Sequence, residues 1–211
     1  IHTVTNLYER QEELDLKTPD KATVIGIGGV GSWVALDLAM AGVDQLYVID
    51  HDHIEEHNLN RTPFKQSQID EMKVTALAEL VAERRPETDV IPVTKRLEDV
   101  AGRFRDDIQD SAIIDCRDHA TPIEDDLQDQ VVVTAGYDGL NYTLHFDPDY
   151  DKLWGEGTGE YQTVPSFIAP PQFIASMVTA ILFKPEEFEH VTGASSGEMV
   201  ETIQKVAGVS Q

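Results

Sequence analysis

The sequence predicts an α/β fold in which a doubly wound, mostly parallel sheet carries an antiparallel extension near its C-terminal end. Three observations predict it. Short apolar runs alternate with longer stretches of helical spacing between residues 22 and 135. A glycine-rich turn joins the first apolar run directly to the first helical stretch. Residues 141–147 then alternate in polarity, which is typical of an antiparallel strand.

The expected elements follow in a regular order. Strands are expected at 22–27, 45–50, 89–94, 111–116 and 130–135, and helices at 30–41, 70–84, 97–108 and 122–128. The helix at 30–41 is apolar nearly all round, which indicates burial against the sheet, and Gly42 ends it. A Gly- and Pro-containing loop at 148–171 precedes a last apolar helix at 171–184.

These elements divide the chain into three parts. Residues 1–19 form an N-terminal helical arm, with its helix around residues 8–14. Residues 20–184 form a Rossmann-like nucleotide-binding domain. Residues 185–211 form an acidic tail that contains Gly and Ser, with a short helix at 197–207.

The charge balance excludes several classes of partner. The 211 residues include 39 Asp and Glu against 16 Lys and Arg, a net charge of −23. Such a surface repels nucleic acid and anionic lipid, so we expect neither as a partner. There is no apolar run of membrane length and no secretory signal pattern, so a cytoplasmic protein is expected. The acidic, lysine-poor surface favours a halophilic source over an ordinary acidic protein.

The cysteine count limits the redox and metal chemistry. Cys116 is the only cysteine, so a disulfide within the chain and a four-cysteine zinc site are both excluded, and no zinc is expected. The exposed-loop histidines His51, His53 and His57 are expected to be solvated rather than to hold a transition metal.

The glycine-rich turn predicts a phosphate site. It follows a strand and opens a helix, so its backbone N–H groups and the positive helix end face an anion. Its glycines and serine are Gly26, Gly28, Gly29, Gly31 and Ser32. Asp50 ends the next strand, where an acidic side chain accepts hydrogen bonds from ribose hydroxyls. The glycines alone are compatible with either ATP or NAD.

A second motif follows Asp50. The loop contains Asp52, then Asn58-Leu59-Asn60-Arg61, and Lys73 comes a dozen residues later. Asp115-Cys116-Arg117-Asp118 ends a later strand. These elements, in this order, resemble the family of ubiquitin-activating enzymes and their bacterial relatives ThiF and MoeB, over residues 20–184.

The resemblance implies ATP- and Mg²⁺-dependent adenylation of a carboxylate. The usual substrate is a ubiquitin-like or sulfur-carrier protein that ends in Gly-Gly, and a small carboxylate is a further alternative. The resemblance implies that Arg61 and Lys73 act on the phosphates and that Asn58 donates to a phosphate oxygen. It also implies that Asp50 and Asp52 bind the cofactor and that Asp118 rather than Asp115 holds Mg²⁺.

The resemblance further implies a homodimer. Arg10 is similar to an N-terminal arginine that reaches the neighbour's nucleotide in this family, so it joins the expected catalytic set with Arg61, Lys73 and Asp118. The apolar helix at 171–184 is expected to contribute to the contact between the two copies.

Four departures from the pattern of this family narrow the range of expected functions. Thr62 replaces the usual glutamine, and His119 and Ile123-Glu124 replace usual asparagine and Arg-Asn positions. Paired Cys-x-x-Cys motifs are absent, and no cysteine follows Cys116, which is expected to be buried rather than nucleophilic. We therefore expect adenylation without a thioester stage. The alternatives are a catalytically weak nucleotide-binding partner subunit and, on the glycine motif alone, an NAD-dependent oxidoreductase.

Overall fold

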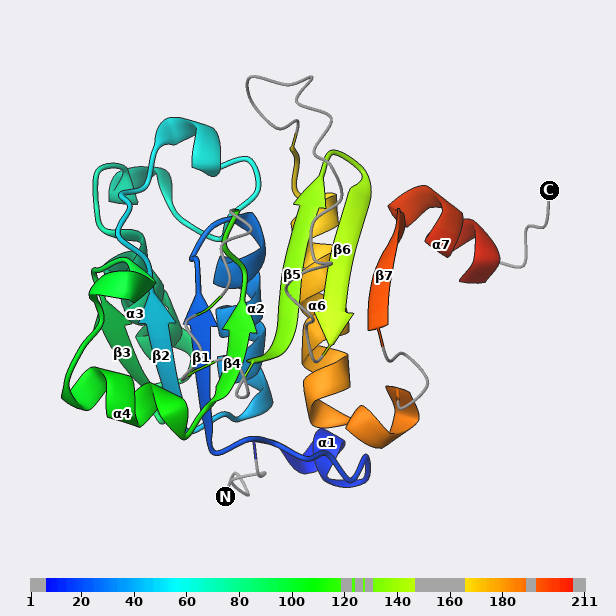
Figure 1. The fold of residues 1–211 in the computed structure, drawn as a ribbon, viewed down its shortest axis with the longest axis horizontal. Helices are drawn as coiled ribbons and strands as arrows, with labels where there is room; N and C mark the ends of the chain where they lie inside the picture. Colours follow the sequence, from blue (N-terminus) through cyan, green and yellow to red (C-terminus); the bar gives the residue numbers. More distant parts are fainter. Residues whose placement is uncertain are drawn as a thin grey trace, which may run out of the picture.

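The computed structural model describes residues 7–118, 123, 127, 131–146, 166–188 and 193–206. Within these residues a seven-stranded sheet has the order β3-β2-β1-β4-β5-β6-β7 (Figure 1). The strands are β1 (Lys21–Ile25), β2 (Gln45–Ile49), β3 (Asp89–Val93), β4 (Ala112–Asp115), β5 (Val131–Asp138), β6 (Asn141–Phe146) and β7 (Gly193–Glu198). The pairs from β3 to β5 are parallel, and β6 and β7 are antiparallel to their neighbours, which confirms the predicted fold class.

The helices lie on both faces of this sheet. They are α1 (Glu9–Glu12), α2 (Gly29–Ala41), α3 (Lys73–Arg84), α4 (Arg103–Gln109), α6 (Ala169–Phe183) and α7 (Met199–Val206), with 3₁₀ turns η1 (Glu56–Asn58), η2 (Gln66–Gln68), η3 (Leu97–Asp99) and η5 (Pro185–Phe188). In Figure 1, α2, α3 and α6 lie behind the sheet and α4 lies in front. In the part of the chain that is described, no helix has the length and apolar content needed to cross a membrane.

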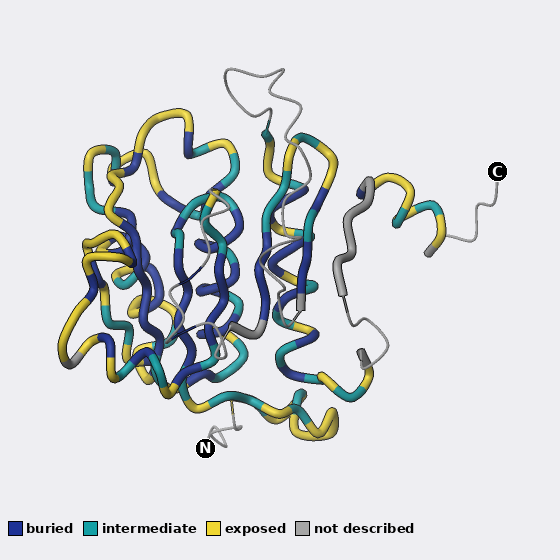
Figure 2. Tube along the Cα trace, in the orientation of Figure 1, coloured by how far each residue is buried: buried dark blue, intermediate teal, exposed yellow. Residues whose placement is uncertain are grey.

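Strand alternation builds a separate apolar core on each face. Val24 and Val48 point toward the α2–α3–α6 side, whereas the next residues, Ile25 and Ile49, point toward the α4 side. β1, β2 and β4 are accordingly buried along most of their length, whereas the edge strand β3 is buried only at Val93 (Figure 2). Because α2 packs against both the sheet and α6, its apolar residues are spread around the helix rather than along one stripe.

The ends of α2 follow the residues that predict them. The helix begins at the glycine-rich turn and ends at Gly42, whose φ of 103° is left-handed. Gly42 N–H donates to Ala39 O and Val43 N–H donates to Leu38 O, the two bonds of a Schellman motif. Gln11 of α1 donates to Ala41 O at 2.8 Å, so the N-terminal arm contacts this end of α2.

Three helix predictions need correction. The expected helix at 97–108 is η3 followed by α4, because Gly102 takes a φ of 66° between them. The helix expected from residue 70 begins at Lys73, because Asp70 has a φ of 70° and residues 53 and 72 form a β-bridge. The last helix begins at Ala169 rather than 171, with two prolines in its first turn.

One strand was not predicted, and two predicted elements lie mostly outside the described residues. β7 was not expected, and it pairs with β6 from residues 193–198 of the predicted tail, next to a short helix, α7, that was expected. Most of the helix predicted at 122–128 and most of the loop predicted at 148–171 lie outside the described residues.

The β3 edge of the sheet carries a proline. Pro92 pairs with Val48 of β2 in the register of the two strands. Proline lacks the N–H that a strand paired on both sides would need, so its presence in β3 fits a strand that pairs on one side only.

Candidate functional site

The candidate site lies at the carboxyl ends of the parallel strands. The chain leaves β1 for β2 on one side, and after β3 it crosses to β4 on the other side of β1. The reversal between β1 and β4 is the topological switch point, where open α/β sheets bind ligands. A cavity of about 450 Å³ lies there, and residues of the glycine turn, of the loop after β2, of the ends of β3 and β4, and of β5 line it.

The glycine turn has its shape because side chains would not fit. Gly26 has a φ of 84°, and a Cβ there would lie 2.8 Å from Cys116 O. A Cβ on Gly31 would lie 1.9 Å from Gly26 O. By contrast, a Cβ on Gly28 would meet no atom within 4 Å, so the turn is open toward the cavity at that residue. Gly26, Gly28 and Gly29 line the cavity, so the shape of the turn is compatible with the predicted phosphate site.

Ser32 and Gly31 contact the glycine turn from within the protein rather than from the cavity. Ser32 is fully buried, and its hydroxyl donates to Gly28 O at 2.6 Å. Neither residue lines the cavity, unlike Gly26, Gly28 and Gly29. In this structure both residues support the turn, and their direct contact with a cofactor stays a prediction.

Asp50 joins the glycine turn to the next strand. One carboxylate oxygen accepts the Ile27 N–H at 2.7 Å, and the other accepts the Asp52 N–H at 2.8 Å. Each carboxylate oxygen has a second lone pair, so these two bonds leave acceptor capacity toward the cavity that Asp50 lines. These two hydrogen bonds therefore do not block the predicted contact between Asp50 and a ribose hydroxyl.

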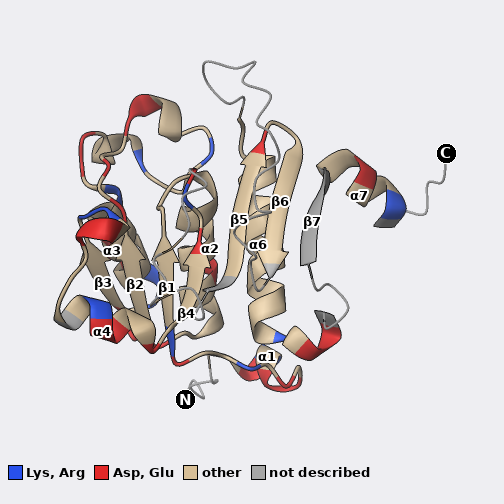
Figure 3. Cartoon of the chain, in the orientation of Figure 1, with Lys and Arg blue, Asp and Glu red and all other residues tan. Residues whose placement is uncertain are grey.

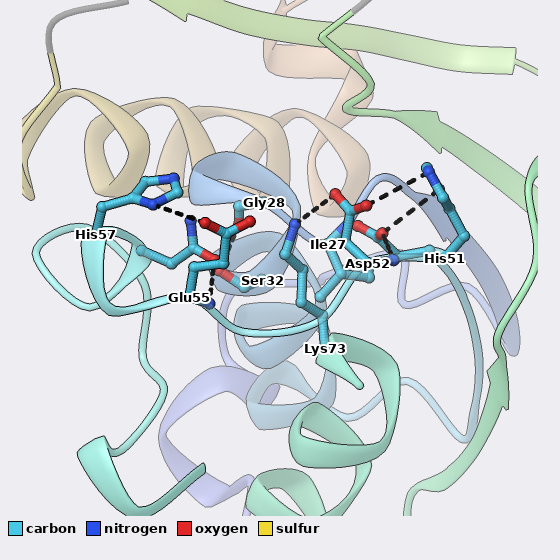
Figure 4. A network of polar contacts seen from close by, with 10 residues as sticks. Ile27, Gly28, Ser32, His51, Asp52, Glu55, His57 and Lys73 are labelled. Carbon is cyan, nitrogen blue, oxygen red and sulfur yellow. Dashed lines mark hydrogen bonds and ion pairs between the residues drawn. The ribbon is translucent and has the colours of Figure 1, made fainter. Parts of the chain in front are cut away.

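Lys73 and Asp52 form an ion pair at the cavity wall (Figure 4). Lys73 Nζ lies 2.9 Å from Asp52 Oδ2, and Lys73 is only 8% exposed. Desolvation acts to raise the pKa of Asp52, but the hydrogen bond and charge of Lys73, together with His51 and Arg96, lower it below its ordinary value. The Lys73 side chain is thus held at the cavity wall by a carboxylate that is itself half exposed.

The loop after β2 holds Arg61 and Asn58 in place. Asn58 Oδ1 accepts the Glu55 N–H at 3.0 Å, so the donating end of the amide is left for other contacts. The departure at Thr62 has a local role, since its hydroxyl donates to Asn58 O at 2.9 Å. Trp33 of α2 donates its indole N–H to Arg61 O at 2.9 Å, which ties this loop to α2.

The end of β4 supplies a carboxylate and a second ion pair. Asp115 is buried and accepts Arg117 Nε and Nη2, each at 2.9 Å, which agrees with a structural role for Asp115. Asp118 is exposed and lines the cavity. Desolvation, and then the charge of Asp115, raise the pKa of the Cys116 thiol well above its ordinary value. Cys116 lines the cavity and is partly exposed rather than buried as expected, and its raised thiol pKa disfavours the nucleophilic thiolate.

Charge in the cavity differs from charge on the rest of the chain. Its lining contains five basic and five acidic residues, against 16 and 39 in the whole sequence. The basic ones are Arg61, Lys73, Lys95, Arg96 and Arg117, and the acidic ones are Asp50, Asp52, Glu55, Glu98 and Asp118. Acidic segments are spread over most described elements, whereas several basic ones lie on the loops above the strands (Figure 3). The lining is therefore balanced in formal charge, in contrast to the strongly acidic chain as a whole.

Sequence reasoning missed part of this lining. Lys95, Arg96, Arg117, Tyr137 and Ser166 line the cavity but were assigned no role from the sequence, although Arg117 lies within the motif of residues 115–118. The signal that could have found the first three is their position directly after the expected strands at 89–94 and 111–116, because parallel strand ends converge on one edge.

Arg10 does not lie at the cavity of its own chain. It is exposed on α1, next to the end of α2 that is opposite to the glycine turn. The 13 residues of α2 separate the two ends by about 20 Å. A role for Arg10 at a nucleotide therefore requires a second copy of the chain.

The loop histidines are exposed, as expected. His57 Nδ1 lies 3.2 Å from Glu55 Oε2, and His51 Nε2 lies 3.4 Å from Asp52 Oδ1. Potential ligand atoms of Asp50, His51 and Asp52 lie within 4.8 Å of one another. Because both carboxylates already bond Ile27, Asp52 or Lys73, this cluster is accounted for by contacts within the chain.

Comparisons with known proteins place these features in a family. The model of the ThiF family matches residues 6–134. The NEDD8-activating enzyme E1 catalytic subunit of Schizosaccharomyces pombe is 39% identical over 95 residues, which are 44% of this chain and 21% of that protein. The molybdopterin-synthase adenylyltransferase of Salmonella typhimurium is 31% identical over 121 residues, which are 54% of this chain and 45% of that protein.

Solved structures share the fold. PaaA has a TM-score of 0.65 at 21% identity, covering 85% of this chain and 64% of that one. Escherichia coli MccB with ATP has a TM-score of 0.64 at 18% identity, covering 85% and 63%. The chain spans between about a fifth and a half of the length of the two curated relatives named above.

Proposed function

Because the chain belongs to the ThiF family, we propose that it uses ATP and Mg²⁺ to adenylate a carboxylate, without a covalent thioester stage. One observation carries the proposal. A single cavity brings together the open glycine turn at the start of α2, the cations Arg61 and Lys73, and the exposed carboxylate of Asp118.

The reaction assigns a task to each group. A carboxylate oxygen attacks the α-phosphorus, a C–O–P bond forms, and the bond to the β-phosphate breaks as pyrophosphate leaves with the electron pair. Backbone N–H groups at Gly28 and Gly29 face the α-phosphate. Arg61 and Lys73 neutralise the departing pyrophosphate, and Asn58 donates to a phosphate oxygen. Asp50 accepts from the ribose.

The residues present also fit a divalent cation. Asp118 offers carboxylate oxygens in the same cavity, and oxygen is the ligand atom that Mg²⁺ takes. When bound there with the triphosphate, Mg²⁺ supplies charge neutralisation on the leaving pyrophosphate. Asp52 is occupied by Lys73, so its part in the site is to hold that lysine.

The proposed substrate is the C-terminal glycine of a ubiquitin-like or sulfur-carrier protein. The relatives named for NEDD8 activation and for molybdopterin-synthase adenylylation support this class. Release of the acyl-adenylate to another molecule is supported by the raised thiol pKa of Cys116, which disfavours a thioester at this residue. We further propose a homodimer in which Arg10 of one copy reaches the nucleotide of the other.

Pyrophosphate exchange tests the activity. The protein is incubated with ATP, Mg²⁺, labelled pyrophosphate and candidate proteins that end in Gly-Gly, and nucleotide binding is titrated in parallel. Exchange that depends on the Gly-Gly protein is expected. Nucleotide binding without exchange by any candidate favours a catalytically weak partner subunit, and retention of NAD instead of ATP favours an oxidoreductase.

The net charge of −23 supports a second, independent proposal about the source. In a halophilic protein, concentrated salt screens self-repulsion between the acidic side chains. The melting temperature is then expected to rise steadily between 0.1 M and 2 M KCl. A melting temperature that is the same at both concentrations contradicts the halophilic proposal and leaves the adenylation proposal untouched.

A further inference from the structure

The hydroxyl groups of Tyr137 and Ser166 form a pair in the cavity wall that the proposed nucleotide contacts leave unused. Tyr137 lies on β5 and Ser166 lies three residues before α6, and their oxygens are hydrogen-bonded to each other. Both residues line the cavity. Segments that are 29 residues apart in the sequence therefore meet at one polar point.

This pair is held directly against the start of α2. A Cβ on Gly29 would lie 2.9 Å from Tyr137 Oη and 3.3 Å from Tyr137 Cε1, so the phenol contacts the first residue of the helix. On the other side, Asn60 Nδ2 donates to Ser166 O at 3.1 Å. The pair is thus fixed between the glycine turn and the loop that carries Arg61.

The order of the strands places the pair on the acyl side of the cavity. β2, β1, β4 and β5 are successive neighbours, so Asp50 at the end of β2 lies three strand spacings, about 14 Å, from β5. If Asp50 takes the ribose and the glycine turn takes the α-phosphate, the next group along this line lies at β5. In an acyl-adenylate, that group is the acyl carbon and its oxygen.

The hydrogen-bond inventory fits an oxygen-bearing ligand. Two hydroxyls carry two hydrogens, and one hydrogen is used between them. The other hydrogen is available to donate to a carboxylate oxygen. The neighbouring lining residues on β5, Ala135 and Gly136, are small and uncharged, so this wall leaves space for a slim chain end.

We propose that Tyr137 and Ser166 position the carboxylate of the substrate for attack on the α-phosphate. This inference rests on the proposed adenylation. It adds to that proposal a donor that acts on the acyl end and makes no contact with the nucleotide.

The test compares two adenosine probes, of which only the second carries an acyl group. AMP reports the nucleotide contacts, and 5′-O-[N-(acetylglycyl)sulfamoyl]adenosine, a stable mimic of a glycyl-adenylate, reports the acyl contacts as well. Tyr137→Phe and Ser166→Ala are expected to weaken binding of the acyl probe about tenfold, the effect of one lost hydrogen bond to a charged or strongly polar group. AMP binding is expected to change less than twofold.

Tyr142→Phe is the matched control. It removes the same hydroxyl from a tyrosine on β6 that bonds Thr202 Oγ1 at 3.1 Å and does not line the cavity. Both probes should bind this variant as they bind the unmodified protein.

The outcomes separate the two proposals. If the unmodified protein binds neither AMP nor ATP, the proposed adenylation is overturned, together with what rests on it. If it binds AMP but both variants keep full affinity for the acyl probe, only the role of Tyr137 and Ser166 is overturned. Equal loss of AMP and acyl-probe binding also overturns that role, because it shows that the pair merely supports the wall.

Discussion

Replacing the glycines of the turn one at a time should separate folding from ligand binding. An alanine at Gly31 places its Cβ 1.9 Å from Gly26 O, whereas an alanine at Gly28 meets no atom within 4 Å. Both positions are occupied by the same residue type within one turn of chain. The pair Gly31→Ala and Gly28→Ala therefore provides an internal control.

The expected magnitudes follow from these distances. An ordinary Cβ contact begins near 3.4 Å, so Gly31→Ala requires Gly26 O and the start of α2 to separate by roughly 1.5 Å. Overpacking of this kind costs about 1–3 kcal/mol or more, and the helix propensity of alanine returns about 1 kcal/mol. A net loss of about 2 kcal/mol in unfolding free energy is expected. Gly28→Ala should leave the unfolding free energy within about 0.5 kcal/mol.

Urea unfolding and nucleotide titration measure the two effects separately. Gly31→Ala should unfold at lower urea concentration and bind AMP weakly, because the turn is displaced. Gly28→Ala should unfold as the unmodified protein does but lose affinity for AMP, since its methyl group stands in the open part of the turn. If Gly31→Ala is as stable as the unmodified protein, Gly31 does not pack closely on Gly26 and the predicted loss of stability is refuted. If Gly28→Ala binds AMP normally, the turn does not contact the phosphate.

Three further predictions concern single side chains. Lys73→Ala should lower pyrophosphate exchange by about 10²–10³-fold, the usual loss for one group that stabilises transition-state charge. The control is Lys65→Ala, which removes a lysine that is paired with Glu83 outside the cavity and should leave exchange unchanged. Equal effects of the two substitutions would contradict the role assigned to Lys73. Asp37 has a pKa raised to about 6 by desolvation, so the stability lost by burying its charge grows as pH rises from about 4 to about 6 and stays constant above that. Asp37→Asn should add about 1 kcal/mol of stability at pH 7 in urea unfolding, after allowance for solvent screening, and nothing at pH 4, and a loss of stability at pH 7 would refute this reasoning. Cys116 should react with a disulfide reagent at pH 8 far more slowly in the native protein than in urea, because its thiol pKa is raised; equal rates would show that the thiol is accessible and ionised.

The sequence predicted the parts of the fold that depend on local patterns. Five parallel strands and α2 follow from apolar runs and from the glycines that border them. β7 was missed because residues 193–198 contain no β-branched or aromatic side chain, and only pairing with β6 makes them a strand. The interrupted helix at 97–109 was missed because apolar spacing continues across Gly102, whose backbone conformation ends the regular turn.

The residues of the candidate site likewise fall into those that sequence motifs predict and those that depend on the tertiary fold. Asp50, Arg61, Lys73 and Asp118 lie in motifs, and the structure brings all four to one cavity. Tyr137 and Ser166 could not be predicted, because their meeting depends on the order of strands in the sheet and on the path of the chain into α6. The Asp52–Lys73 ion pair joins two motif residues, but spacing alone gives no sign that they bond each other rather than a ligand.

Pro92 has a consequence for how this chain behaves in concentrated solution. An exposed strand offers a row of donors and acceptors on which a strand from another molecule can align, the first step of edge-to-edge aggregation. In β3 that row is interrupted by a residue with no donor, and the same strand begins with the exposed Asp89. The sheet is therefore protected against open-ended growth on this side by its own sequence, at a residue that does not line the cavity. Substitution of Pro92 by valine would leave every proposed ligand contact in place and remove that protection.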